Sequence, residues 1–377
     1  MPRVSSLFLA LSLLSAPLSA QHSPSTPVDV AYVATNGSLQ TYDVDPTTGV
    51  PTAEGEPLKI PTQGALVVPS TDDHFLYVFG LDGQDSNDRL WVYSTDSLGV
   101  PHRAPLQILD TPTEIIQFKI DPNRRLAYAS DFTGKIWLFT IDPKTGLVDK
   151  HSKIVAASKR NGPCGTRWYD SGLFLLDGFN SDGSRLHVEW YCISFDTYGG
   201  HYYVRDIDRS TGKLAPKREI FAWDNSGGGG DSVSFTKKSM IDFYSSGGGP
   251  ENAVNVYPPS GGSEPLFSCT VTMLQACGYA LTAFVDPAGE YLFLQISDDV
   301  TQIAKIDMTA KKIVDTGNFV PEQMRQMSPD RILIYTALQS TPNVPIYVFD
   351  PKTGAVQPGG TIQVSTQSYG LVLALRQ

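Results

Sequence analysis

The chain has 377 residues, of which 41% are hydrophobic, 10% aromatic and 18% charged, and this composition is globular and excludes a disordered chain. The 29 Lys and Arg against 39 Asp and Glu give a formal net charge of −10, so the chain lacks the basic surface that nucleic acids require, and we expect no nucleic-acid binding. The 33 glycines and 27 prolines favour a chain rich in tight turns over a helix bundle.

Residues 1–20 have the layout of a secretory signal peptide. Arg3 precedes the apolar run 7–11, and the segment ends in small residues at Ala20. Cleavage after Ala20 would leave a flexible segment 21–27 and 28 basic against 39 acidic residues, a net charge of −11. Since no segment approaches the ~20 apolar residues of a membrane span, we predict a soluble protein that is secreted or periplasmic. A buried N-terminal helix is the alternative interpretation of the leader.

A sequence motif recurs along the mature chain. In it, a run of alternating apolar and polar residues, rich in β-forming types, ends in Asp-Pro-x-Thr-Gly or a variant of it. The copies 39–49 and 136–146 are clear, whereas 254–262 and 303–311 are degraded. The seven copies end at Gly49, Gly99, Gly146, Gly212, Gly262, Lys311 and Gly354. Their mean spacing of about 51 residues is typical of a β-propeller with one four-stranded blade per copy. The alternating run suits a half-buried strand, and its ending suits a hairpin turn.

A second element lies between the copies, in which an apolar strand, a polar turn and another apolar strand follow one another, as at 118–128. With the hairpin it supplies strands a, b, c and d of an antiparallel blade. The mature chain enters at a b strand, 28–34, and its last apolar strand, 369–375, has no b strand after it. We therefore predict that 369–375 becomes strand a of the first blade and closes the ring. The predicted fold is a single all-β, seven-bladed β-propeller over 28–377, with an insertion around 157–201.

The four cysteines form an even set in a chain predicted to be exported, which favours disulfides over metal or thiol chemistry. Three pairings are open, and we favour Cys164 with Cys192 and Cys269 with Cys277, with four unpaired thiols as the alternative. The six histidines show no zinc-site spacing and no Cys-x-x-Cys occurs, so we expect no structural zinc.

The run that ends in Asp-Pro-x-Thr-Gly, coupled to an Asp-Pro or Pro-Asp turn before Leu-x-Tyr, resembles the lactonase-type seven-bladed propellers, which include 6-phosphogluconolactonase-like and carboxymuconate-cyclising enzymes. The resemblance runs from Val28 to Leu375. It implies lactone chemistry at the mouth of the central channel, where family members carry a histidine just ahead of an inner strand, with arginines and a glutamate nearby. The matching segment 111–118 has Glu114 at the place of the histidine, so the resemblance assigns no catalytic residue.

The register also predicts which residues ring one mouth of the channel, because the d-to-a loops and the starts of the inner strands meet there. With one position per blade they are Gln63, Glu114, Asp170, Asp231, Tyr279, Glu322 and Tyr369. Arg167 and Arg325 fall at the same mouth. Because four of the seven are carboxylates, we expect either a divalent cation such as calcium or pairing with the arginines. Solvated loop acids that never converge are the alternative.

Two functions fit these patterns. The first is an exported lactonase-like enzyme that acts on a small polar ligand, derived from a lactone or a sugar, at the channel mouth. The second is a non-catalytic propeller that binds a ligand or another protein, which the missing histidine favours. We expect a monomer in either case.

Overall fold

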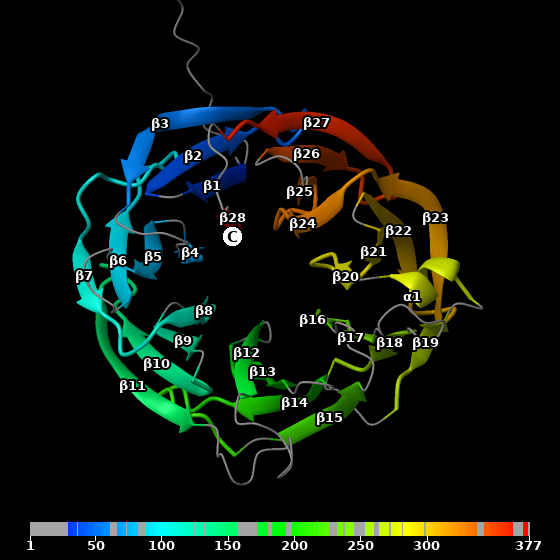
Figure 1. Ribbon diagram of the computed structural model, residues 1–377, viewed down its shortest axis with the longest axis horizontal. Helices are drawn as coiled ribbons and strands as arrows, with labels where there is room; N and C mark the ends of the chain where they lie inside the picture. Colours follow the sequence, from blue (N-terminus) through cyan, green and yellow to red (C-terminus); the bar gives the residue numbers. More distant parts are fainter. Residues whose placement is uncertain are drawn as a thin grey trace, which may run out of the picture.

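The computed structural model describes most of the chain after the leader. The described residues are 29–35, 37–60, 66–72, 74–81, 88–123, 125–131, 133–156, 172–179, 183–193, 198–216, 218–225, 232–236, 238–244, 253–259, 264–270, 273–280, 282–297, 299–337, 343–364 and 372–375. Their strands form seven four-stranded antiparallel sheets, which stand around a central channel as the blades of a propeller (Figure 1). The predicted all-β, seven-bladed fold is confirmed. The predicted leader and the segment 21–27 lie outside the described residues.

Each blade follows the chain from an inner to an outer strand, and blade 1 takes its inner strand from the C-terminus. Blade 1 holds β28 (Val372–Leu375), β1 (Asp29–Thr35), β2 (Ser38–Val44) and β3 (Pro51–Lys59). Blade 2 holds β4 (Leu66–Pro69), β5 (Phe75–Leu81), β6 (Asp88–Ser94) and β7 (Gln107–Asp110). Blade 3 holds β8 (Ile115–Ile120), β9 (Leu126–Asp131), β10 (Lys135–Ile141) and β11 (Val148–Ala156). Blade 4 holds β12 (Gly172–Phe179), β13 (Arg185–Ile193), β14 (Tyr198–Asp206) and β15 (Arg218–Asn225).

The remaining blades repeat this order. Blade 5 holds β16 (Ser232–Phe235), β17 (Met240–Tyr244), β18 (Ala253–Tyr257) and β19 (Phe267–Thr270). Blade 6 holds β20 (Thr282–Val285), β21 (Tyr291–Ser297), β22 (Val300–Asp307) and β23 (Lys312–Val320). Blade 7 holds β24 (Gln323–Met327), β25 (Leu333–Ala337), β26 (Val344–Phe349) and β27 (Val356–Ile362). A short helix, α1 (Gln275–Tyr279), connects blade 5 to blade 6. In the described part of the chain, no helix is long and apolar enough to cross a membrane.

The two ends of the chain meet in one blade, as the register predicted. The C-terminal strand β28 pairs antiparallel with β1, with Ala31 opposite Leu375 and Ala34 opposite Val372. This pairing gives the N-terminal strand a neighbour on both sides and leaves no open break between the first and last blades. The prediction that the C-terminal strand closes the ring is therefore confirmed.

The described glycines that end repeats have a specific packing role. Gly212 adopts a φ of 70°, which a residue with a Cβ adopts at a cost, and a Cβ placed there would lie 2.7 Å from Leu138 of the preceding blade. The carbonyl of Gly212 also accepts a hydrogen bond of 2.8 Å from the Tyr128 hydroxyl. Tyr32 and Tyr77 make the same contact to the turn glycines of blades 2 and 3. The repeated turn therefore serves two purposes, since it closes its own hairpin and locks onto a neighbouring blade.

The core lies between the blades. Apolar side chains from facing sheets form clusters at the seams, as in the group Phe79, Phe118 and Phe139 between blades 2 and 3. The ring centroids of Phe79 and Phe118 lie 4.8 Å apart, and those of Phe118 and Phe139 lie 5.5 Å apart. Such seams bury apolar area on both faces of each sheet, which accounts for the alternating runs in the sequence.

One of the two favoured disulfides is confirmed. Cys269, at the end of blade 5, is bonded to Cys277 in α1, with a Cα–Cα distance of 5.9 Å. Cys192 is placed in β13, but its side chain and the whole of Cys164 lie outside the description, so that pairing stays a prediction. Of the segment 157–201, where we expected an insertion, the described residues from 172 onwards belong to blade 4.

Candidate functional site in the central channel

The channel wall consists of seven inner strands, β28, β4, β8, β12, β16, β20 and β24 (Figure 1). Each of them has a partner strand on its outer side only. The free edge of such a strand presents backbone N–H and C=O groups, which water or a polar ligand can satisfy. The channel is therefore suited to polar occupants.

A cavity of about 800 Å³ occupies one end of this channel. Its lining comes from blades 1, 2, 3, 4 and 7 and includes the last residues of four inner strands, Pro69, Ile120, Phe179 and Leu375. Residues of the a-to-b turns, which follow these strands directly, complete the wall. The cavity thus lies at the a-to-b end of the channel, opposite the mouth that the sequence analysis selected.

Polar side chains reach this cavity from three blades. They are Thr71, Asp72, Gln117, Lys119 and Gln326. The aliphatic and aromatic remainder, including Val68 and Phe179, supplies the apolar part of the lining. Lys119 and Asp72 bring opposite charges to the described lining, and the amides and the hydroxyl supply neutral donors and acceptors. An apolar cavity with a few placed polar groups is the usual form of a small-molecule site.

Gln117 links blades 3 and 4, two of the blades that line the cavity, by a hydrogen bond. Its side-chain oxygen accepts hydrogen bonds from the backbone N–H of Leu176 in β12 and from the Ser130 hydroxyl in β9. Strand β8 shifts register between Ile115 and Gln117, and β12 shifts between Leu176 and Gly178. The bond to Leu176 carries the Gln117 side chain across the seam between blades 3 and 4. Both bonds use the oxygen of Gln117, and neither uses its amide nitrogen.

The structure places only part of the expected ring of mouth residues. Glu114 is exposed directly ahead of β8, Tyr279 is the last residue of α1, and Arg325 is exposed in β24. The remaining positions lie outside the described residues, namely Gln63, Arg167, Asp170, Asp231 and Tyr369. Their convergence at the mouth stays a prediction.

Glu322 directly precedes β24, and its carboxylate contacts its own blade. Its carboxylate accepts a hydrogen bond from the hydroxyl of Thr336 in β25. Burial, with a smaller contribution from the Glu322 charge, raises the pKa of Tyr347 in β26 to about 12. Among the described residues, no group of three or more His, Cys, Asp or Glu is arranged to hold a metal ion. The expected calcium also stays a prediction.

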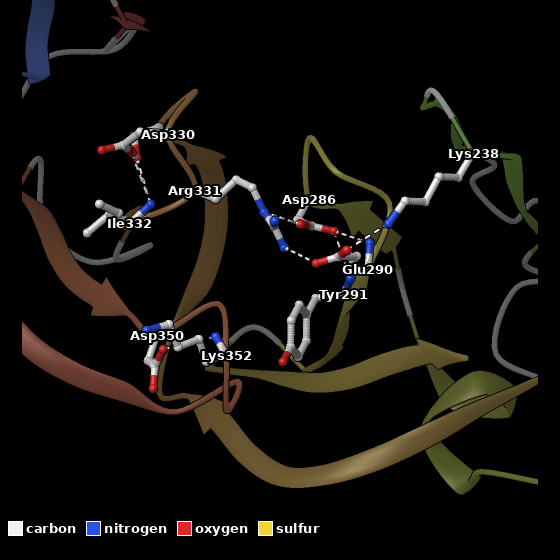
Figure 2. Close-up of polar contacts among 10 residues, drawn as sticks. Lys238, Asp286, Glu290, Tyr291, Asp330, Arg331, Ile332, Asp350 and Lys352 are labelled. Atoms are coloured by element: carbon white, nitrogen blue, oxygen red, sulfur yellow. Dashed lines mark hydrogen bonds and ion pairs between the residues drawn. The ribbon is translucent and has the colours of Figure 1, made fainter. Parts of the chain in front are cut away.

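An ion network spans the a-to-b turns of blades 5, 6 and 7 (Figure 2). The cavity also lies at the a-to-b end of the ring. The Arg331 Nε atom lies 2.6 Å from Asp286 Oδ2, and its Nη2 atom lies 2.9 Å from Glu290 Oε2. The Nζ atom of Lys238 lies 2.7 Å from Glu290 Oε1. Hydrogen bonds from Lys238 and then Arg331 lower the pKa of Glu290. The network joins three successive blades and stabilises this face of the ring.

Asp286 is the buried centre of that network. Its side chain is fully buried, and its Oδ1 atom accepts the backbone N–H groups of Glu290 and Tyr291 at 2.6 and 2.7 Å. Arg331 adopts a φ of 69°, and Gly289 has the same φ in the matching turn of blade 6. The structure therefore holds a non-glycine residue in the left-handed region, where its guanidinium reaches the buried carboxylate (Figure 2).

The sequence analysis missed the cavity residues and the ion network. The repeated Asp-Pro and Ser-Pro-Asp turns signalled that a-to-b turns recur, but nothing in one turn indicates which charged residue of the next blade it meets. The polar residues of β8 and β24 were also visible as interruptions of apolar strands. Only the ring geometry brings them to one cavity.

Comparisons with known proteins agree with this fold. No family model and no curated protein sequence matches the chain. Among solved structures, a Bacteroides fragilis protein provisionally named a 6-phosphogluconolactonase superposes with a TM-score of 0.64 at 17% identity, covering 94% of this chain and 99% of that one. The periplasmic gluconolactonase of Pseudomonas aeruginosa superposes with a TM-score of 0.62 at 15% identity, covering 93% and 99%. The chain therefore has the fold of the lactonase-type propellers, as its repeats predicted.

Proposed function

We propose that the protein is an exported lactonase-like propeller that binds a small polar ligand, derived from a lactone or a sugar, in its central channel. The observation that carries the proposal is the cavity of about 800 Å³, whose lining combines polar residues from three blades with apolar residues. Export is supported by the leader-like segment 1–20. The fold shared with a periplasmic gluconolactonase supports the ligand class.

The cavity residues suggest how such a ligand would be held. The amide of Gln326 and the hydroxyl of Thr71 suit the hydroxyl groups of a sugar-derived ligand, because each can donate or accept, and the amide nitrogen of Gln117 can donate. The ammonium group of Lys119 suits a carboxylate or the carbonyl oxygen of a lactone. Phe179, which is only partly buried, offers the apolar contact that a carbon ring needs.

The test is a calorimetric titration of the chain without residues 1–20. The probes are glucono-1,5-lactone, gluconate and 6-phosphogluconate, and acid release is followed in parallel, so that turnover and binding are separated. We expect one probe to bind, and Lys119→Met to weaken its binding at least about tenfold, as the loss of a charge-assisted hydrogen bond does. Lys305→Met, at an exposed position of β22, is the matched control and should bind as the wild type does. Equal affinities for both variants, or no binding of any probe, would refute the assignment of this cavity.

A further inference from the structure

The seam between blades 4 and 5 is built from ionisable side chains. In β13, Leu186 and Val188 belong to the apolar cluster shared with blade 3. Since successive residues of a strand point to opposite faces, His187 and Glu189 face blade 5. In β17, Ile241 and Phe243 belong to the cluster shared with blade 6, so Asp242 faces blade 4. Consecutive blades pack face to face (Figure 1), and the alternation of side chains therefore directs these three residues to one seam.

All three side chains are removed from water. His187 and Glu189 are each 5% exposed, and Asp242 is 6% exposed. The Asp242 carboxylate accepts a hydrogen bond of 3.2 Å from the Asn255 amide, and the Asn255 oxygen accepts one of 2.7 Å from the Ser268 hydroxyl. A polar row thus crosses β17, β18 and β19 on the face that blade 4 covers.

Asp242 differs from the buried aspartates of the turns. Asp121 and Asp286 each accept backbone N–H groups of their own a-to-b turn, and Asp131 accepts two backbone N–H groups and the Trp137 indole N–H in a b-to-c turn. Such donors stabilise the charged form. Asp242 lies in the middle of a strand, where the backbone groups pair with neighbouring strands, and its described partner is a neutral amide.

Ionisation of Asp242 therefore makes the closed seam less favourable relative to an open, hydrated seam. Burial raises its pKa to about 6, with the Asn255 hydrogen bond opposing the rise. The charged or titratable groups that face it among the described residues are His187 and Glu189 from blade 4 and Tyr257 from β18, with Glu264 acting on Tyr257. A charged carboxylate is unfavourable in a buried seam, whereas it is hydrated once the seam opens.

We propose that the seam between blades 4 and 5 is the joint at which this ring opens, and that loss of a proton from Asp242 opens it. The neutral carboxyl is compatible with the closed seam, and the carboxylate favours the hydrated, open one. The Asp242 carboxyl has a higher pKa in the closed seam than in the open, hydrated one. Between these two pKa values the closed state therefore binds more protons than the open state. The free energy of opening the seam therefore falls as the pH rises from about 4 to about 6, and it stays constant above that range.

The test is hydrogen exchange read by mass spectrometry on the whole mature chain without ligand, at pH values from about 4 to about 8, with protection factors corrected for the intrinsic rate. We expect peptides from β12, β13, β16 and β17 to lose up to about 100-fold in protection as the pH rises, since the two pKa values differ by about two units. Peptides from β5 and β9, in apolar seams, should not show this loss. A loss of the same size in every blade would overturn the proposal with the wild type alone.

Two variants assign the proton. Asp242→Asn preserves shape and removes the charge, and it should abolish the pH dependence of the seam peptides. Asp29→Asn is the matched control, because the pKa of Asp29 is also raised but this residue lies in β1, next to blade 7. It should alter only peptides of blades 1 and 7. If the protection of the seam peptides still depends on pH in Asp242→Asn, Asp242 is not the group that controls opening. The same holds if His187→Gln, and not Asp242→Asn, abolishes this pH dependence.

Discussion

Arg331 combines backbone strain with a buried ion pair, and two substitutions separate them. Its φ of 69° costs a non-glycine residue about 1–2 kcal/mol. Its guanidinium neutralises the buried carboxylate of Asp286. Arg331→Ala keeps the strain and removes the pair, and we expect the free energy of unfolding to fall by about 3 kcal/mol, the lower end for such pairs because Asp286 keeps two backbone donors. Arg331→Gly removes both, and its loss should be about 1 kcal/mol smaller.

The assay is urea unfolding at neutral pH, followed by tryptophan fluorescence and circular dichroism. Lys311→Gly is the control, because Lys311 is exposed and has a φ of 51° at the place where other repeats carry glycine. It should leave the stability unchanged or raise it by up to about 1 kcal/mol. Equal losses in Arg331→Ala and Arg331→Gly would refute the strain, and a loss below about 1 kcal/mol in Arg331→Ala would refute the contribution of the ion pair.

Three further predictions concern the seams. Gly212→Ala should lower the free energy of unfolding in urea by about 2–4 kcal/mol, because a Cβ there meets Leu138. Gly317→Ala, with a φ of 71° and open space around it, should lower it by about 1 kcal/mol. Equal losses would contradict the packing role of the turn. Tyr128→Phe removes the hydrogen bond to the Gly212 carbonyl and should cost about 1 kcal/mol, and an unchanged urea midpoint would show that the bond contributes nothing. Burial, then the charges of Asp330 and Asp43, raise the pKa of Asp29 to about 7, so the stability of the wild type should fall as the pH rises from about 4 to about 7. Asp29→Asn should reduce this fall by about 2 kcal/mol after allowing for screening. If the melting temperatures of the wild type and of Asp29→Asn change with pH in parallel, the prediction is contradicted.

The fold was predictable from the sequence because its determinants are local and repeated. The turn glycines need a positive φ and contact a neighbouring blade, so their spacing reports the blade length directly. Even the copy that ends in Lys311 keeps the same backbone, with a φ of 51°, and could be placed by spacing alone. Ring closure followed from counting strands, because the last apolar strand has only the first blade left to join.

The candidate site was less predictable because its determinants are tertiary. Gln117 lines the cavity beside register shifts in β8 and β12, and a bulge leaves no clear trace in an apolar run. Glu322 stands at a predicted mouth position, yet its carboxylate bonds to Thr336 on the next strand. A sequence register places the Cα of each residue at one end of the channel, but the direction of its side chain depends on partners from other strands.

The positions of the cavity and of the polar seam bear on each other. The described lining comes from blades 7, 1, 2, 3 and 4, so the seam between blades 4 and 5 lies at its border. Blade 4 is fastened to blade 3 by an apolar cluster and by the bond from Leu176 to Gln117. Separation at the polar seam would thus move blade 5 away from blade 4 while Gln117 and Lys119 keep their places. If the channel binds the ligand proposed above, pH would then change the rate of entry more than the affinity. Association and dissociation rates measured on both sides of pH 6 would distinguish this from a site whose binding groups themselves titrate.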